Sequence, residues 1–205
     1  MSEGTGLRER KKAATRLALH EAALRLAVEQ GPERVTVEAI ADAANVSRRT
    51  FSNYFSSKEE ALFHGDTVRL RRMLELLRER PTDEAPWTAL SRAALHQAGE
   101  MFEDPTVSWL TRRRQLHGHP GLLAHQVAAY GAIERELAGE LAHRLTGPDP
   151  ALRSRILAAA FLATLRVAVQ YWFEQPDGPL VDTLRATLAL AAPAAATEGR
   201  TSTHR

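Results

Sequence analysis

Two adjacent arginines, Arg48 and Arg49, directly follow Ser47, a residue type that often caps the start of a helix. A guanidinium group holds its N–H donors in a fixed fork and can donate two parallel hydrogen bonds to the major-groove edge of guanine. Cations are unfavourable at the start of a helix, because the backbone amides there already carry partial positive charge. The placement of the pair therefore indicates an external anionic partner, for which double-stranded DNA is suited.

Short helices on either side of Ser47 would position this pair. Thr36 can cap a helix that ends before Ser47, and the next helix carries Phe51 and Phe55 on one face, four residues apart. The segment 57–60 (SKEE) has the spacing of a capping box and predicts the start of a further helix. Two helices joined by so short a turn form a helix-turn-helix, whose second helix can enter the major groove.

The rest of the chain also reads as helices, because apolar residues recur every three or four positions and β-branched runs are missing. The first helix has an apolar side with Leu17, Leu24 and Val28. The fold class is therefore all-α, with about nine helices. We expect a helix-turn-helix domain at 1–60, a helical ligand-binding and dimerisation domain at 61–192, and a disordered tail at 193–205. The expected helices cover about 13–30, 36–44, 47–55, 58–80, 86–102, 105–116, 123–145, 150–175 and 179–191.

Composition narrows the function classes only in part. The 205 residues include 25% charged side chains and a formal net charge of +2, so the total charge does not by itself indicate a nucleic-acid partner. The absence of cysteine excludes a thiol nucleophile and a zinc site with cysteine ligands. No signal-peptide pattern is found, so a cytoplasmic location is expected. The apolar stretch 156–173 carries Arg166 near its middle, which favours a helix buried in protein over one in a membrane.

Residues 35–58 read VTVEAIADAANVSRRTFSNYFSSK and closely resemble the DNA-binding signature of the TetR/AcrR family. The resemblance covers about residues 10–62. It implies a transcriptional regulator that binds a palindromic operator as a homodimer, acts as a repressor, and is released by a small-molecule effector. The DNA-binding residues that it implies are Thr36, Ser47, Arg48, Arg49, Thr50, Asn53, Tyr54 and Lys58.

Within this set, Thr36, Tyr54 and Lys58 match the family's phosphate contacts, and Arg48, Arg49, Thr50 and Asn53 match its groove-facing positions. Structural roles stay open for two of them: Tyr54 could be a core aromatic, and Lys58 a solvated cation in a first helical turn. One departure is Ser52, where the family often carries Tyr and a phosphate contact is thereby weakened. The basic segment 8–12 (RERKK) could supply phosphate contacts instead, or could simply be a soluble N-terminus.

The two last helices have more apolar surface than one neighbour can cover, which predicts a second copy of the chain as the cover. In the family, these helices pair with their symmetry mates; a monomeric core is the alternative. The residues expected at the dimer interface are Phe161, Leu165, Trp172, Leu184 and Leu188.

A ligand pocket is predicted from polar residues on an apolar helix. Arg166 and Gln170 lie four residues apart there, and a buried charge must be paired or must bind something charged. We expect Arg166 to bind the polar end of a partly apolar ligand, with a salt bridge to Glu134 or Glu136 as the alternative. The weaker candidates for ligand binding are Trp109, Arg113 and Tyr130.

Segments 112–116, 134–138 and 163–166 resemble a branch of TetR regulators that bind acyl-CoA-like ligands. No nucleotide-binding, hydrolase or zinc-protease motif occurs, so we expect neither catalysis nor a cofactor. An all-helical enzyme, or a protein-interaction module without DNA binding, is the alternative. The histidines at 117, 119 and 125 have no acid among them and lie at a turn, so no metal site is expected.

Overall fold

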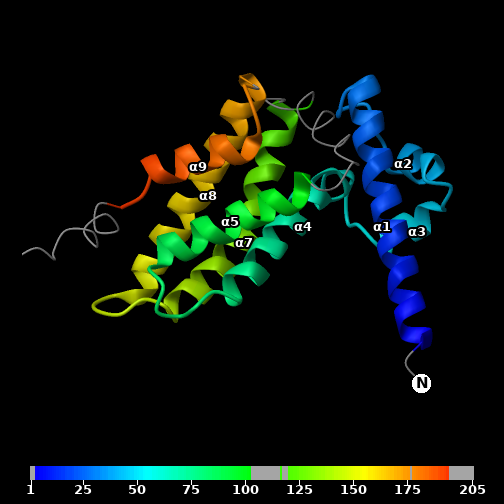
Figure 1. Ribbon diagram of the computed structural model, residues 1–205. Helices are drawn as coiled ribbons and strands as arrows, with labels where there is room; N and C mark the ends of the chain where they lie inside the picture. Colours follow the sequence, from blue (N-terminus) through cyan, green and yellow to red (C-terminus); the bar gives the residue numbers. More distant parts are fainter. Residues whose placement is uncertain (1–2, 103–115, 117–119, 176, 194–205) are drawn as a thin grey trace, which may run out of the picture. The chain divides into compact units, whose positions relative to one another are not determined.

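The computed structural model describes residues 3–102, 116, 120–175 and 177–193, and in this part the chain forms eight α-helices and no strand (Figure 1). The all-α prediction is confirmed. The helices are α1 (Glu3–Gln30), α2 (Val37–Ala43), α3 (Arg48–Ser52), α4 (Lys58–Arg78), α5 (Pro86–Phe102), α7 (Pro120–Ala142), α8 (Pro150–Glu174) and α9 (Leu180–Leu190). The helix expected at 105–116, apart from residue 116, and the tail beyond residue 193 lie outside the described residues.

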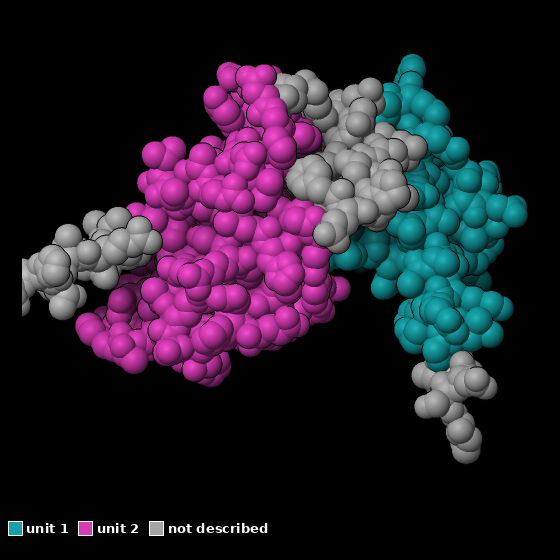
Figure 2. Space-filling view, in the orientation of Figure 1, with its two compact units in different colours: residues 1–68, 106–129 teal, residues 69–105, 130–205 magenta. Residues whose placement is uncertain are grey.

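The chain divides into two compact units (Figure 2). Unit 1 comprises residues 1–68 and 106–129, and contains α1, α2, α3 and the first part of α4. Unit 2 comprises residues 69–105 and 130–205, and contains the rest of α4 with α5, α8, α9 and the C-terminal part of α7. The helix-turn-helix therefore lies wholly within unit 1.

Local turn and capping residues set the helix ends in unit 1. Gly31, with φ of 86°, follows α1, and Asn45, with φ of 54°, follows α2; both adopt the left-handed conformation that these residue types tolerate best. At the start of α4, the Ser57 hydroxyl accepts from the Glu60 N–H at 3.1 Å. The Glu60 carboxylate accepts in turn from the Ser56 N–H at 2.7 Å, so the capping box is present with its return bond one residue earlier than predicted.

Unit 1 has its own hydrophobic core, to which α1, α2, α3 and α4 all contribute. Phe51 and Phe55 are both buried, with ring centroids 5.8 Å apart, as predicted. Leu17 is 52% exposed, so the predicted apolar side of α1 is wrong at this residue, and Leu19 is buried instead. The recognition helix thus rests on a packed base of aromatic and aliphatic side chains.

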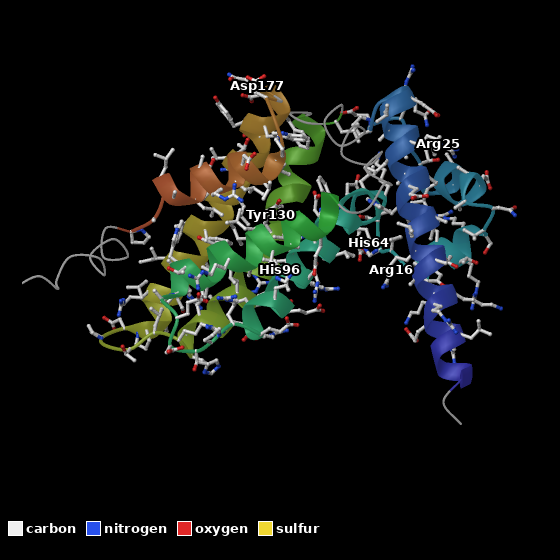
Figure 3. The ribbon with its side chains drawn as sticks, viewed as in Figure 1. Arg16, Arg25, His64, His96, Tyr130 and Asp177 are labelled. Carbon is white, nitrogen blue, oxygen red and sulfur yellow. The ribbon has the colours of Figure 1, made fainter. Side chains whose placement is uncertain are left out.

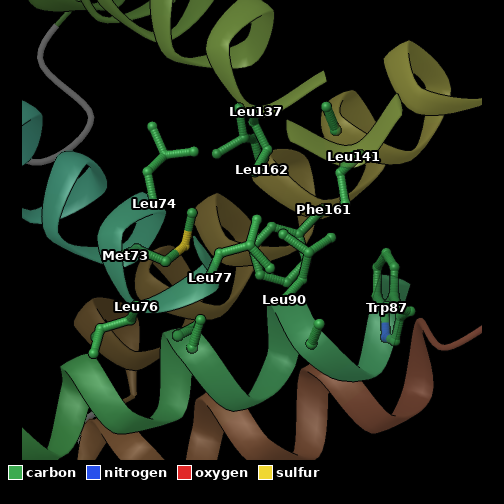
Figure 4. Packing of buried hydrophobic residues seen from close by; sticks show 14 of the residues in the cluster. Met73, Leu74, Leu76, Leu77, Trp87, Leu90, Leu137, Leu141, Phe161 and Leu162 are labelled. Carbon is green, nitrogen blue, oxygen red and sulfur yellow. The ribbon is translucent and has the colours of Figure 1, made fainter. Parts of the chain in front are cut away.

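Unit 2 has a larger core, in which buried residues of α4, α5, α7, α8 and α9 meet (Figure 4). The Trp87 ring meets Phe161 edge to face, with centroids 5.5 Å apart, and its Nε1–H donates to the Leu188 carbonyl at 3.1 Å. Tyr130 is half-buried against this core. These contacts connect the start of α5 to α8 and to the end of α9.

Candidate nucleic-acid interface

Two hydroxyl side chains fix the starts of α2 and α3. The Thr36 hydroxyl accepts a hydrogen bond from the Ala39 N–H at 3.1 Å, and the Ser47 hydroxyl accepts from the Thr50 N–H at 3.0 Å. The hydroxyl oxygens of Ser47 and Thr50 also lie 2.8 Å apart, within hydrogen-bond distance. Thr36 and Ser47 are exposed, so a hydroxyl that accepts from the backbone can still donate its own proton to a phosphate.

Arg48 and Arg49 both lie in the first turn of α3, but their surroundings differ. Arg48 forms an ion pair with Glu38 of α2 at 3.1 Å, and both side chains are more than half exposed. Arg49 is exposed and forms no ion pair with any described residue. A surface ion pair contributes at most about 1 kcal/mol, so Arg48 can leave Glu38 at little cost. Arg49 is already free to bind an acceptor outside the chain.

At the end of α3, Asn53 is exposed and Tyr54 is half-buried. The Tyr54 ring packs against the core of unit 1, as the structural alternative predicted. Arg16 of α1 covers this region: its guanidinium carbon lies 5.9 Å from the centroid of the Tyr54 ring and 5.8 Å from that of Phe55, and it donates to the Tyr54 carbonyl at 3.5 Å. The sequence prediction missed Arg16, although its position one turn before Leu19 and His20 places it on the buried side of α1.

Lys58 does not have the environment expected of a phosphate contact. Its ammonium group donates to the carbonyl oxygens of Pro32 at 3.0 Å, Glu33 at 3.2 Å and Val35 at 2.9 Å. An ammonium group has three N–H donors, so all of them are used within the chain. Lys58 is therefore not a solvated cation: it fastens the loop between α1 and α2 to the first turn of α4, and this environment favours a structural role over the predicted phosphate contact.

The residues predicted to bind a ligand are not brought together. Arg166 is exposed and forms no ion pair with Glu134 or Glu136 in the described structure, so the premise of a buried charge is wrong. The Gln170 amide donates to the Glu174 carboxylate at 3.1 Å, and Tyr130 borders the core of unit 2. The other two candidates, Trp109 and Arg113, lie outside the described residues.

A groove of about 520 Å³ lies between α7 and α8 in unit 2, and of the predicted ligand residues that the structure describes, Tyr130, Arg166 and Gln170, none lines it. Both small residues and charged side chains line it. The lining residues are Glu134, Arg135, Ala138, Gly139, Ala142, Ala151, Ser154 and Arg155.

Three residues predicted for a dimer interface are instead part of the chain's own cores. Phe161, Leu184 and Leu188 are 0%, 5% and 2% exposed, so a partner could not reach them. Leu165 and Trp172 are half-buried against the same cores. The prediction selected the inward side of α8 and α9, because both sides of α8 are apolar and helical spacing alone does not distinguish them.

The outward side of α8 carries the apolar residues that the sequence prediction missed. Leu152, Ile156, Val167 and Tyr171 are 58%, 60%, 50% and 51% exposed. The spacing of the first three residues, with Ala159 and Ala163 between them, places them in one stripe opposite the buried side. By length and composition α8 is also apolar enough to cross a membrane, although 28% of that stretch is buried within the chain.

Two family models match the sequence. Residues 19–64 match the model of bacterial regulatory proteins of the tetR family, and residues 84–196 match the MftR C-terminal domain. The transcriptional regulator TcmR of Streptomyces glaucescens is 36% identical over 183 residues, which cover 86% of this chain and 81% of that relative. The first match contains the helix-turn-helix described above.

Solved structures show the same fold. The fatty acid degradation regulator FadR of Bacillus halodurans has a TM-score of 0.55 at 15% identity, covering 86% of this chain and 93% of its own. FadR of Bacillus subtilis, solved with stearoyl-CoA, has a TM-score of 0.53 at 20% identity, covering 85% and 96%. With a capped helix-turn-helix, two matching domain models and a relative at 36% identity, the chain belongs to the TetR family of bacterial transcriptional regulators and has a C-terminal domain of the MftR type.

Proposed function

We propose that this regulator represses transcription by binding an inverted-repeat DNA operator as a homodimer, and that a small ligand releases it. Arg49 carries the DNA-binding part of the proposal, because it is exposed and free of ion pairs in the first turn of the recognition helix. The N-terminal residues of such a helix reach base edges in the major groove. Thr36, which is exposed, and Tyr54, which is half-buried, each carry a hydroxyl group that can bind a phosphate, and phosphate contacts fix register rather than sequence.

The outward side of α8 supports the homodimer. Ile156 is 60% exposed and Val167 is 50% exposed. Ala159 and Ala163, which lie between them on the same side of α8, are small enough to let a second helix approach closely. A contiguous exposed apolar surface is typical of an interaction site. A two-fold axis would place the same surface of each copy against the other and would present two recognition helices to one duplex.

A lipid bilayer is a less suitable cover for this surface. The opposite side of α8, with Phe161 and Ala168 fully buried, belongs to the cores of unit 2. A helix that crossed a membrane would have to leave these cores, and it would place Arg166 at the hydrocarbon centre, which costs about 2.5–3.5 kcal/mol. We therefore place the regulator in the cytoplasm without a membrane partner.

The effector is assigned to unit 2, where the MftR-type domain lies. FadR of Bacillus subtilis was solved with stearoyl-CoA, and an apolar, acyl-like ligand fits a domain that consists of apolar helices. Among the described candidates, Tyr130 is the best placed, since its ring borders the core. Arg166 could contact a ligand only from the surface, because its side chain is exposed.

Selection of bound fragments from random double-stranded DNA tests the proposal. The wild-type chain should enrich an inverted repeat whose half-sites are centred about 34–36 Å apart, or a multiple of that distance. Transcription from a promoter carrying this sequence should fall when the chain is present. Enrichment of no sequence would contradict specific DNA binding, and enrichment of an unrepeated site would contradict the two-fold arrangement.

A further inference from the structure

The basic segment 8–12, for which the sequence leaves two roles open, is part of a helix. α1 begins at Glu3, and residues 6–14 are all exposed, so this part of α1 is not covered by the rest of unit 1. In Figure 1, the N-terminal part of α1 extends past α2 and α3. A helix fixes the direction of each of its side chains, so the cations of this segment can be assigned to sides of α1.

Arg16 identifies the side of α1 that faces the end of α3. Figure 3 shows Arg16 on α1, and its guanidinium group lies over the Tyr54 ring and reaches the Tyr54 carbonyl. Lys12 and Arg8 precede it by one and two turns, about 6 and 12 Å along the axis and about 40° and 80° around it. The three cations therefore form a row that continues from Tyr54 along α1.

Of the other two cations of the segment, Arg10 lies about 120° around α1 from Arg16, on the side opposite Lys12 and Arg8. Lys11 lies about 140° from Arg16 in the other direction and is about 60° from Arg8. Arg10 donates to the Gly6 carbonyl of its own helix at 3.2 Å. Glu9 lies about 20° from Arg16 and offsets one charge of the row. None of Arg8, Arg10, Lys11 and Lys12 forms an ion pair with a described residue.

We propose that Arg8 and Lys12 bind backbone phosphates of the operator, next to the phosphate assigned to Tyr54. The inference rests on the proposed function and extends its DNA interface from the helix-turn-helix to α1. The cations are exposed, unpaired and on one side of a helix that passes the end of the recognition helix. They would compensate for the phosphate contact that is weakened at Ser52, and they would bind all sequences alike.

The experiment compares two double variants on the DNA selected by the wild-type chain, by measuring the operator affinity between 50 and 200 mM salt. The variant Arg8→Gln/Lys12→Gln should lower the slope of log K against log salt by roughly 0.9 for each phosphate that is no longer neutralised, hence about 2 per subunit. The variant Arg10→Gln/Lys11→Gln is the matched control. It removes one arginine and one lysine from the same turns of the same helix, and it should lower the slope clearly less, because Arg10 lies opposite the row and Lys11 lies beside it rather than in it. Gln forms helices about as well as Arg and Lys, so far-UV circular dichroism should be the same for all.

The acidic residue in the row gives a test of opposite sign. Glu9→Gln should strengthen binding to operator and random DNA alike, because it removes a repulsion from the phosphates. Equal slopes for the two double variants, whether lowered or not, would overturn the assignment of phosphate contacts to this side of α1. Failure of the wild-type chain to bind any DNA would instead overturn the proposed function, and this inference with it.

Discussion

The ammonium group of Lys58 donates to the Val35 carbonyl at 2.9 Å and thereby joins α4 to the loop before α2. The same ammonium group also donates to the carbonyls of Pro32 and Glu33. In the same turn of α4, the His20 Nδ1 lies 2.7 Å from the Ala61 carbonyl. The first turn of α4 is thus fastened both to α1 and to the loop that leads into the helix-turn-helix.

From this relationship we predict that Lys58→Met lowers the stability of the chain by about 1–3 kcal/mol, because three carbonyls would no longer have their charged donor. Operator affinity should fall while the slope of log K against log salt stays unchanged. Urea denaturation and binding at several salt concentrations measure the two effects, and Lys11→Met, at an exposed lysine, is the control. A slope lowered by about 0.9 per subunit at unchanged stability would restore Lys58 as a phosphate contact.

Arg49→Ala should reduce discrimination at one base pair of each half-site by about 1–3 kcal/mol. Affinity for random DNA should change much less, because the substitution removes hydrogen bonds to a base rather than a general attraction. Repeating the DNA selection with the variant, and competing operator against random duplex, measures this. Equal weakening on both kinds of DNA would show that Arg49 binds the backbone.

The contribution of Arg48 to DNA binding should depend on Glu38 of α2, its ion-pair partner. Glu38→Gln removes the ion pair that holds Arg48 at 3.1 Å and also removes a negative charge near the duplex. Binding should therefore become tighter, and Arg48→Ala in the Glu38→Gln background should cancel the gain. A loss of affinity in Glu38→Gln would indicate that the ion pair orients Arg48 for binding.

The pH dependence of stability should include a contribution from Glu84 in unit 2. Hydrogen bonds from Arg80, with further attraction from Arg92, lower the pKa of the Glu84 carboxyl below its usual range. This stabilisation is fully present above the unfolded-state pKa of about 4.3 and is lost as the pH falls through the folded-state value. Glu84→Gln should thus flatten the fall in melting temperature below about pH 4.3. Asp182→Asn is the control, because Asp182 forms an exposed ion pair with Arg185, and a surface ion pair contributes at most about 1 kcal/mol.

The starts of four helices were predictable because local residues determine them, whereas α3 ends at Ser52 rather than 55 and α7 covers Pro120–Ala142 rather than 123–145. Pro86 and Pro150 begin α5 and α8, and the caps Thr36 and Ser47 begin α2 and α3 as expected. The start of α1 was not predictable from the pattern, since residues 3–12 include Gly4 and Gly6, which disfavour a helix, and Leu7 is their one aliphatic side chain, too few to reveal a period.

The sides of helices and the distant contacts could not be read from the sequence. α8 is apolar on both sides, so nothing in its spacing shows that Phe161 points inward and Val167 outward. Lys58 finds its three acceptors 23 to 26 residues earlier in the chain, a relationship that depends on how α1 packs against α4. The exposure of Arg48 and Arg49 was predictable from the motif, because it requires only that the two residues follow a capping residue at the start of a helix.

Substitutions on the outward side of α8 should separate dimerisation from folding. Val167→Glu and Ile156→Glu each place a charge on an exposed apolar residue, so the single chain should fold normally while the dimer dissociates. Val68→Glu is the matched control, since Val68 is 48% exposed on α4, against 50% for Val167. A dimer that persists in both α8 variants would place the interface elsewhere.

Sedimentation equilibrium of the wild-type chain on the selected duplex tests the central claim, that two copies joined through α8 present two recognition helices to one operator. We predict two chains per inverted repeat, with Val167→Glu sedimenting as a monomer that binds the same duplex more weakly. A stable wild-type monomer that occupies a single half-site at full affinity would contradict the account.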